Sequence, residues 1–200
     1  IQWESQRRRL TEMYMTLPEH VRRCFRHCEV RSANLPESGD THIDGSRGMF
    51  EAMLKNTIGL ADPRYAFWME ADTVPIRASW LPALQRLCRA EPFLVRGSTL
   101  RHDVKRDVLI QRFGQHFLYH ITGVALYNVP EYRSFYFNRV VPYMHGKKMH
   151  HFAFDVALGK YLFDPDHYDE WRRLAHLFQY TTIIQNRWGE SYEIAERATT

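Results

Sequence analysis

The stretch Tyr-Ala-Phe-Trp-Met-Glu-Ala-Asp-Thr-Val-Pro-Ile-Arg, residues 65–77, decides how the rest of the chain is arranged. Its first five residues are apolar and rich in aromatic side chains, which is typical of a buried β-strand. The run ends in Glu70 and Asp72, which would share one face because residues two apart in a strand point the same way. Pro75 then ends the strand, and Ser79 is placed to cap a following helix. The stretch therefore predicts an acidic pair at the strand end where open α/β sheets bind ligands.

The segments upstream of this stretch continue the α/β pattern. Residues 4–27 are expected to be mainly helical, with an apolar face that packs in the core and a break at Pro18. Residues 28–35 are expected to form a short strand. Asp44 can then cap an amphipathic helix that ends at Gly59. A strand, a helix and a strand in this order predict a parallel pair of strands with a crossover helix.

The segments downstream predict further strands and helices of similar length. We expect helices over residues 80–90, 152–163 and 171–177, and strands over residues 93–97, 120–128 and 181–185. The polar residues 98–107 between two of these strands are expected to form a surface loop. The predicted fold class is therefore α/β, with a mixed, mostly parallel sheet flanked by helices in one domain over residues 1–200.

Composition excludes several classes of protein. A chain of 200 residues with 44% hydrophobic and 14% aromatic residues can bury a core and does not resemble a disordered protein. The formal net charge is +4 and the basic residues are scattered, so we expect no nucleic-acid partner. Three cysteines without a CxxC pair support neither a disulfide framework nor a zinc ribbon. No apolar run approaches the roughly 18 residues of a membrane span. Because the chain starts at Ile1, we expect an excised fragment with room for an upstream anchor or signal.

The acidic pair has two chemical interpretations. Carboxylate oxygens suit Mg²⁺ or Mn²⁺, which takes one or two protein ligands and fills its shell with water and substrate phosphates. Such a cation would neutralise the charge that grows on a departing diphosphate. The alternative is that Glu70 and Asp72 form exposed ion pairs with Arg64 or Arg77.

Residues 67–77, followed by Trp80-Leu81, resemble the metal-binding Asp-x-Asp region of GT-A-type nucleotide-sugar glycosyltransferases. Two later segments resemble that family in the same order. Residues 120–127, with Gly123 at their centre, are similar to the glycine-containing strand that lines the sugar and acceptor pocket. Phe154-Asp155 is similar to the acidic residue at the start of a helix that faces this pocket. The resemblance runs from about residue 40 to residue 186.

The resemblance implies a GT-A-like, Rossmann-like fold and a role for each matching residue. It implies metal and diphosphate contacts for Glu70 and Asp72, with His176 as a further metal ligand by its order in the chain. It implies Arg47 and Gly123 near the donor. It implies Asp155 as the base that deprotonates the acceptor hydroxyl if the reaction inverts the anomeric centre.

The implied activity is the transfer of a hexosyl or pentosyl group from a nucleotide-diphosphate sugar to a carbohydrate or glycoprotein acceptor, with Mn²⁺ or Mg²⁺ as cofactor. By analogy with eukaryotic relatives, the expected location is the Golgi or the secretory pathway. Glu70 departs from the commonest motif by replacing its first aspartate. The family's first strand and nucleotide-binding loop should precede residue 30, where this chain is expected to be helical, so we expect that strand to lie upstream of this sequence.

Three alternatives stay open. The chain could be a catalytically silent carbohydrate-binding or scaffold domain of the same fold. His145, His150 and His151 with Asp155 could form a zinc site of a hydrolase, since His151 and Asp155 are four apart. The aromatic residues 132 and 135–137 could stack on sugar rings or bases, or form part of the core.

Overall fold

A computed structural model of the chain describes residues 2–39, 41–60, 62–70, 73–75, 78–99, 119–149 and 152–186. The chain divides into two compact units, Ile1–Leu60 and Ala61–Thr200. No helix among the described residues combines the length and the hydropathy that a bilayer crossing requires.

The first unit is helical. It contains α1 (Gln2–Met15), α2 (Glu19–Arg22), η1 (Glu37–Gly39) and α3 (His42–Lys55). Helix α3 begins after Thr41, whose side chain accepts a hydrogen bond from the Asp44 backbone N–H at 3.0 Å. It ends at Asn56, which adopts the left-handed conformation with φ of 57°. Phe50 and Leu54 are fully buried on the inner side of α3.

Several expectations for the first unit are wrong. The cap of α3 is Thr41 rather than Asp44, and the helix ends before Gly59. Residues 28–35 form no strand, so the predicted parallel pair with residues 65–69 does not exist. The apolar face predicted to pack in the core is exposed at Leu10 and Met13, which are 48% and 56% accessible.

The second unit is a sheet with helices on both faces. The strands that the structure describes are β1 (Tyr65–Trp68), β2 (Thr73–Pro75), β3 (Val95–Thr99), β4 (Ile121–Asn128), β5 (Phe178–Tyr180) and β6 (Ile184–Asn186). Four of them form one sheet in the order β1-β4-β3-β5, and β2 pairs with β6 in a separate antiparallel ribbon. Within the large sheet, β4 pairs antiparallel with both β1 and β3, and only β3 and β5 run parallel.

The α/β class is confirmed, but the sheet is mixed rather than mostly parallel. The reason lies in the connections: β1 and β4 are neighbours although α4 and β3 separate them in sequence. For β1 and β4 to be parallel, the chain between them would have to cross back to the end of the sheet where β1 begins. Instead, β4 runs beside β1 in the opposite direction. The glycine-bearing strand predicted at residues 120–128 is confirmed as the central strand β4.

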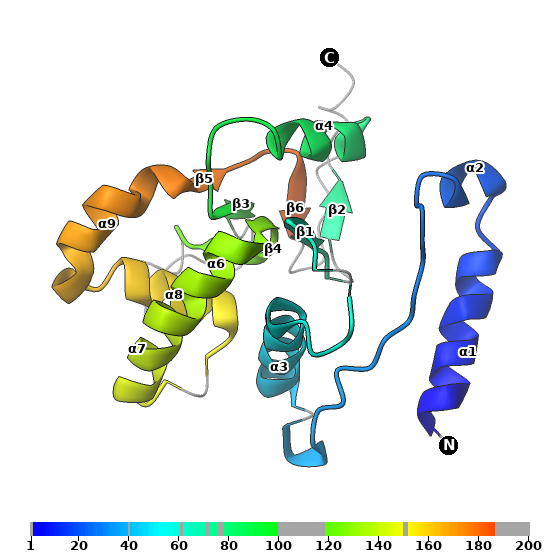
Figure 1. Ribbon diagram of the computed structural model, residues 1–200, viewed down its shortest axis with the longest axis horizontal. Helices are drawn as coiled ribbons and strands as arrows, with labels where there is room; N and C mark the ends of the chain where they lie inside the picture. The colour runs from blue at the N-terminus through cyan, green and yellow to red at the C-terminus, as the bar shows by residue number, and fades with distance from the viewer. Residues whose placement is uncertain are drawn as a thin grey trace, which may run out of the picture. The chain divides into compact units, whose positions relative to one another are not determined.

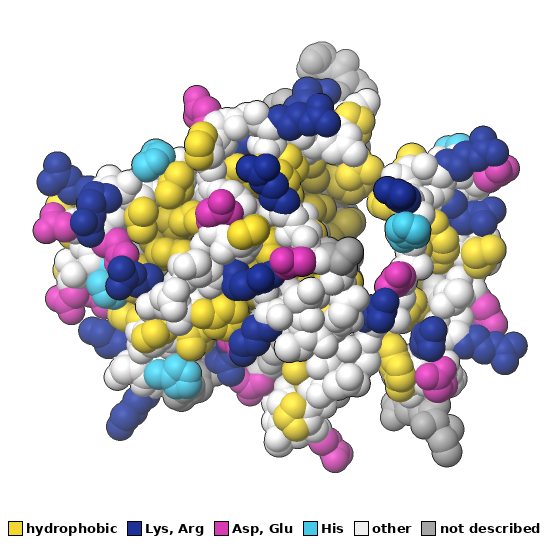
Figure 2. All heavy atoms as spheres, viewed as in Figure 1, with side chains coloured by type: hydrophobic (Ala, Val, Ile, Leu, Met, Phe, Trp, Pro, Cys, Tyr) yellow, Lys and Arg dark blue, Asp and Glu magenta, His cyan; other side chains and the backbone are white. Residues whose placement is uncertain are grey.

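The helices among the described residues of this unit are α4 (Trp80–Leu87), α6 (Val129–Phe135), α7 (Val141–Gly146), α8 (Phe154–Leu162) and α9 (Tyr168–Leu174). A π-helical segment, η3 (Tyr136–Val140), joins α6 to α7, and short 3₁₀ turns η4 (Pro165–His167) and η5 (Ala175–Leu177) flank α9. Figure 1 shows α4 next to the β2 and β6 strands, with α6 to α9 grouped away from it. Figure 2 shows basic and acidic side chains interspersed over the viewed face of this unit.

The alternation of side chains along β1 and β4 divides the core between the two faces of the sheet. On one face, Phe67 packs on Trp80 of α4, and Val124 joins the cluster around Leu84. On the other face, the Trp68 ring packs edge-on against Phe154 of α8, and Tyr127 packs against Tyr132 of α6. Residues two apart in a strand share a face, so Gly123 lies on the α8 side together with Tyr127.

Candidate functional site

A tight turn positions Glu70 just beyond the end of β1. The Glu70 N–H donates to Thr73 Oγ1 at 2.9 Å, and the Thr73 N–H donates to the Glu70 carbonyl at 3.0 Å. Thr73 is 8% exposed, so this reciprocal pair is shielded from water. Threonine therefore fixes the backbone at Glu70 at the point where the strand leaves the sheet.

Gly123 allows the Glu70 carboxylate to lie against the central strand. The register places Trp68 opposite Ala125, so Glu70 follows toward the level of Gly123. A Cβ built on Gly123 would stand 3.1 Å from Glu70 Oε1 and 2.8 Å from Phe154 Cζ. The second distance is shorter than any ordinary carbon contact, so only glycine fits between the carboxylate, the Phe154 ring and β4.

Asp155 reaches the same glycine from the first turn of α8. Its Oδ2 atom accepts a hydrogen bond from the Gly123 N–H at 2.9 Å, and its Oδ1 atom accepts from the Val156 N–H at 2.9 Å. The N-cap position of α8 is Ala153, which offers no side-chain cap. A carboxylate in the first turn satisfies part of the helix start and is favoured by the helix dipole.

His120 lies behind Asp155 and is buried. Its Nε2 atom is 3.6 Å from Asp155 Oδ2, and the His120 side chain is 3% exposed. Gly159, one turn along α8, makes this approach possible, because a Cβ there would stand 2.7 Å from the His120 Cβ. The chain thus supplies two close backbone approaches, at Gly123 and at Gly159, on the two sides of the Asp155 carboxylate.

The surroundings of Asp155 hold its carboxyl group in the ionised form. Burial by itself would raise the pKa of Asp155, but the hydrogen bond and charge of His120 and the N–H groups of Gly123 and Val156 outweigh it. The pKa of Asp155 is therefore below its ordinary value. Beneath it, Tyr127 donates to the Gly123 carbonyl at 2.8 Å, and its burial raises the pKa of Tyr127 well above the ordinary value.

The structure brings together three of the residues predicted from sequence. Glu70, Gly123 and Asp155 meet at one place, and we call these three residues the carboxylate cluster. Asp72 lies outside the described residues, so its place beside Glu70 stays a prediction. Among the residues that the structure describes, no group of three or more His, Cys, Asp and Glu side chains is arranged to hold a metal ion.

His176 is not part of the carboxylate cluster. It is an exposed residue of η5, which directly precedes β5. The pairing of strands places Phe178 beside Val95, and Val95 opposite Tyr127. Tyr127 is four residues from Gly123 along β4, which corresponds to about 13 Å. The mixed sheet therefore places His176 toward the end of β4 that is opposite to Gly123. The order of His176 in the sequence did not predict this position.

Arg47 belongs to the first unit, where its side chain lies in the middle of α3. Its Nη2 atom pairs with Asp44 Oδ1 at 2.6 Å, and the Arg47 side chain is 18% exposed. A contact of Arg47 with a donor stays a prediction.

Of the two remaining sequence hypotheses, the zinc site stays untested and the aromatic cluster is decided by the structure. His150 and His151 of the zinc hypothesis lie outside the described residues, and His145 is exposed near the end of α7. The aromatic cluster is part of the core: Tyr132 and Tyr136 are fully buried, and Phe135 is 9% exposed. These three rings are therefore part of the core rather than a stacking surface for a ligand.

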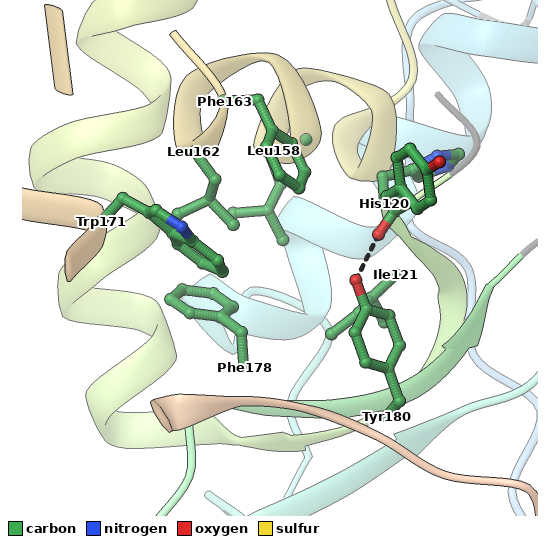
Figure 3. A pocket seen from close by; sticks show the side chains of 10 residues that line it. His120, Ile121, Leu158, Leu162, Phe163, Trp171, Phe178 and Tyr180 are labelled. Atoms are coloured by element: carbon green, nitrogen blue, oxygen red, sulfur yellow. Dashed lines mark hydrogen bonds between the residues drawn. The ribbon is translucent and has the colours of Figure 1, made fainter. Parts of the chain in front are cut away.

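A pocket beside His120 was not found from the sequence. It lies between the start of β4, the end of β5, α8 and α9 (Figure 3). Five aromatic residues line it: Tyr119, Phe163, Trp171, Phe178 and Tyr180. These side chains come from four separate elements or loops, so no local pattern could have grouped them. The one available signal was Gly159, a glycine inside an apolar helix, which often marks a close approach.

Comparison of the chain with protein-family models, with curated proteins and with solved structures finds no match.

Proposed function

We propose that the second unit transfers a sugar from a nucleotide-diphosphate donor to a hydroxyl acceptor with the help of Mn²⁺ or Mg²⁺. The observation that carries the proposal is the carboxylate cluster. The Glu70 Oε1 atom lies beside Gly123, and the N–H of the same glycine binds Asp155. Two carboxylates from distant parts of the chain thus converge on Gly123 of the buried strand β4, and this convergence supports a site between two substrates.

The donor side of this proposal rests on Glu70 and Asp72. Both offer carboxylate oxygens, the ligand type that Mg²⁺ and Mn²⁺ prefer, so these residues suit the expected cation and would hold it. When bound, such a cation would supply positive charge beside the departing diphosphate. Glu70 contributes a fixed position, because its N–H and carbonyl are both bound by Thr73.

The acceptor side rests on Asp155. Its lowered pKa keeps the carboxylate ionised at neutral pH, and its Oδ1 atom keeps a second lone pair beside its bond to the Val156 N–H. In the proposed reaction the acceptor oxygen attacks the anomeric carbon, and the bond from that carbon to the diphosphate breaks. The nucleoside diphosphate leaves with the electron pair, and Asp155 accepts the hydroxyl proton.

The test is release of nucleoside diphosphate from a panel of nucleotide sugars, with and without Mn²⁺. The unmodified chain should release it only with the metal. The variants Glu70→Gln and Asp155→Asn should lower the rate by about a hundredfold, as expected when a metal-binding carboxylate or a general base is removed. Asp72→Ala should abolish release.

Asp169→Asn is the matched control, because Asp169 is an exposed carboxylate on α9 outside the carboxylate cluster. It should keep full activity. The proposal fails if no donor is turned over in a metal-dependent way. It also fails if the variants at Glu70 and Asp155 are as active as the control.

A further inference from the structure

Helix α1 carries apolar side chains along one face. At about 100° per residue, four of its side chains fall within an arc of about 100° around the helix axis, and we call them the apolar stripe: Trp3, Leu10, Met13 and Tyr14. Leu10 and Met13 are 48% and 56% accessible, and the other two are partly exposed. Single exposed apolar residues are common, but a stripe of them along one helix marks a surface that binds a partner.

The charged residues of α1 are sorted around the apolar stripe. On the same helical projection, Arg7 borders one side of the stripe and Arg9 borders the other. Glu4 and Glu12 project from the opposite half of the helix, where Glu12 pairs with Arg8 at 2.9 Å. Arg7 lies 3.8 Å from Glu4, but both side chains are exposed, so this ion pair contributes little. Both edges of the apolar stripe are therefore positively charged.

These edges argue against a second copy of the chain as the partner. Helices that pair through an apolar stripe are usually stabilised by opposite charges at the edges of the stripe. Two copies of α1 would instead collect four arginine side chains at these edges, while Glu4 and Glu12 point away from them. Like charges across an interface suppress association, whereas the same arginines attract a negatively charged surface.

We propose that α1 lies on the surface of an anionic lipid membrane, with the apolar stripe at the boundary between headgroups and acyl chains. Trp and Tyr rings favour this boundary. Arginine stems lie along apolar surface while their guanidinium groups reach the lipid phosphates. Residues 16–27 add further positive charge, because they contain three arginines and one acidic residue, Glu19. This role is independent of the proposed function and is measured without a nucleotide sugar.

The short apolar stripe requires both attractions at once. Four partly exposed side chains supply a small apolar area, and the binding of such a helix grows with apolar area and with its attraction to anionic lipid. We therefore expect α1 to bind anionic lipid and to leave neutral lipid essentially unbound.

The experiment mixes the full chain with phosphatidylcholine vesicles, with and without phosphatidylserine, and separates bound from free protein by sedimentation. The chain should bind the vesicles that contain phosphatidylserine, and salt should release it because salt screens the attraction of arginine to the lipid. Leu10→Gln combined with Met13→Gln should weaken binding by about tenfold, since two buried apolar side chains are lost. Arg7→Gln combined with Arg9→Gln should also weaken it by about tenfold.

Met15→Gln is the matched control. Met15 is 58% accessible on the same helix, but it lies about 200° around the axis from Met13 and so outside the apolar stripe. Met13→Gln alone should weaken binding by about threefold, whereas Met15→Gln should leave it unchanged. Circular dichroism should show the same helix content in both variants, so that the difference in affinity reports the apolar stripe.

Three outcomes would overturn the inference. The first is that the chain does not bind vesicles that contain phosphatidylserine, or binds pure phosphatidylcholine equally well. The second is that Met13→Gln and Met15→Gln bind with the same affinity. The third is a partner of another kind, shown by a dimer in sedimentation equilibrium that Leu10→Gln dissociates, or by capture on immobilised polyglutamate without binding to vesicles. Donor turnover tests the proposed function alone and leaves each of these outcomes unaffected.

Discussion

Replacing Gly123 by alanine should both destabilise the second unit and disturb the carboxylate cluster. The new Cβ would stand 2.8 Å from Phe154 Cζ and 3.1 Å from Glu70 Oε1. Ordinary carbon contacts lie at about 3.5–4.0 Å, so the Phe154 ring must retreat by more than half an ångström. That ring is 1% exposed and packs edge-on against Trp68, with ring centroids 6.4 Å apart. It therefore has little space into which it can move.

The magnitude follows from two opposing terms. Overpacking of a buried site costs about 1–3 kcal/mol. Alanine lowers the conformational entropy of the unfolded chain relative to glycine, which stabilises the folded state by about 0.4–1 kcal/mol. Gly123→Ala should therefore lower the free energy of unfolding by about 1–2 kcal/mol. Gly146→Ala is the matched control, because a Cβ at Gly146 would meet no atom within 4 Å. It should raise the free energy of unfolding by about 0.4–1 kcal/mol.

Urea unfolding followed by tryptophan fluorescence measures both variants. The double variant Gly123→Ala with Phe154→Leu should recover part of the loss, because a smaller side chain removes the collision. Donor turnover by Gly123→Ala should fall with the displacement of Glu70. The reasoning is refuted if Gly123→Ala is as stable as Gly146→Ala, or if the effects of the two substitutions in the double variant are simply additive.

Three further predictions concern stability. The pKa of Asp155 is lower in the folded state than in the unfolded state, so the ionised carboxylate stabilises the fold above the unfolded pKa of about 3.9, and this stabilisation is lost as the pH falls through the lower folded pKa. Urea unfolding from pH 7 to pH 3 measures the difference in stability between the unmodified chain and Asp155→Asn. This difference should shrink only below about pH 4. Arg96 is 4% exposed and donates to two carbonyl groups, one at the end of α4 and one in the turn after it. Arg96→Met should therefore lower the free energy of unfolding by about 1–3 kcal/mol, measured by thermal or urea unfolding. Arg86 is exposed, so the control Arg86→Met should change the free energy of unfolding by less than about 0.5 kcal/mol. Thr41→Ala removes the N-cap of α3 and should cost about 0.5–2 kcal/mol, seen as faster amide exchange in its first turn, while Thr41→Ser should preserve the cap.

Local patterns in the sequence were sufficient for most of the elements of the second unit. The apolar run that ends at Glu70, the glycine-bearing strand and the helix that starts near Asp155 appear in the structure as β1, β4 and α8. Hydrophobic periodicity and the positions of proline and glycine depend on neighbouring residues, so they are readable without the fold. The acidic end of the apolar run identified Glu70 as a candidate for the same reason, whereas Gly123 and Asp155 became candidates through the resemblance to GT-A-type glycosyltransferases.

Strand order and direction were decided only by the tertiary structure. The pattern of strands and helices suggested parallel pairing, but β4 returns beside β1 and β3 in the antiparallel direction. The choice depends on contacts between strands far apart in sequence, which local propensity does not encode. This choice also moved His176 away from Gly123 and gathered Tyr119, Trp171 and Tyr180 around one pocket.

What the sequence determined by itself was therefore the chemistry available at the end of β1, because a carboxylate after a buried strand is a local feature. What the tertiary structure decided was which residues share that place. Gly123 brings Glu70 and Asp155 together because it lacks a side chain, and Gly159 admits His120 behind Asp155 for the same reason. Both are close approaches between elements, and only packing in three dimensions determines which atoms occupy the space that a glycine leaves.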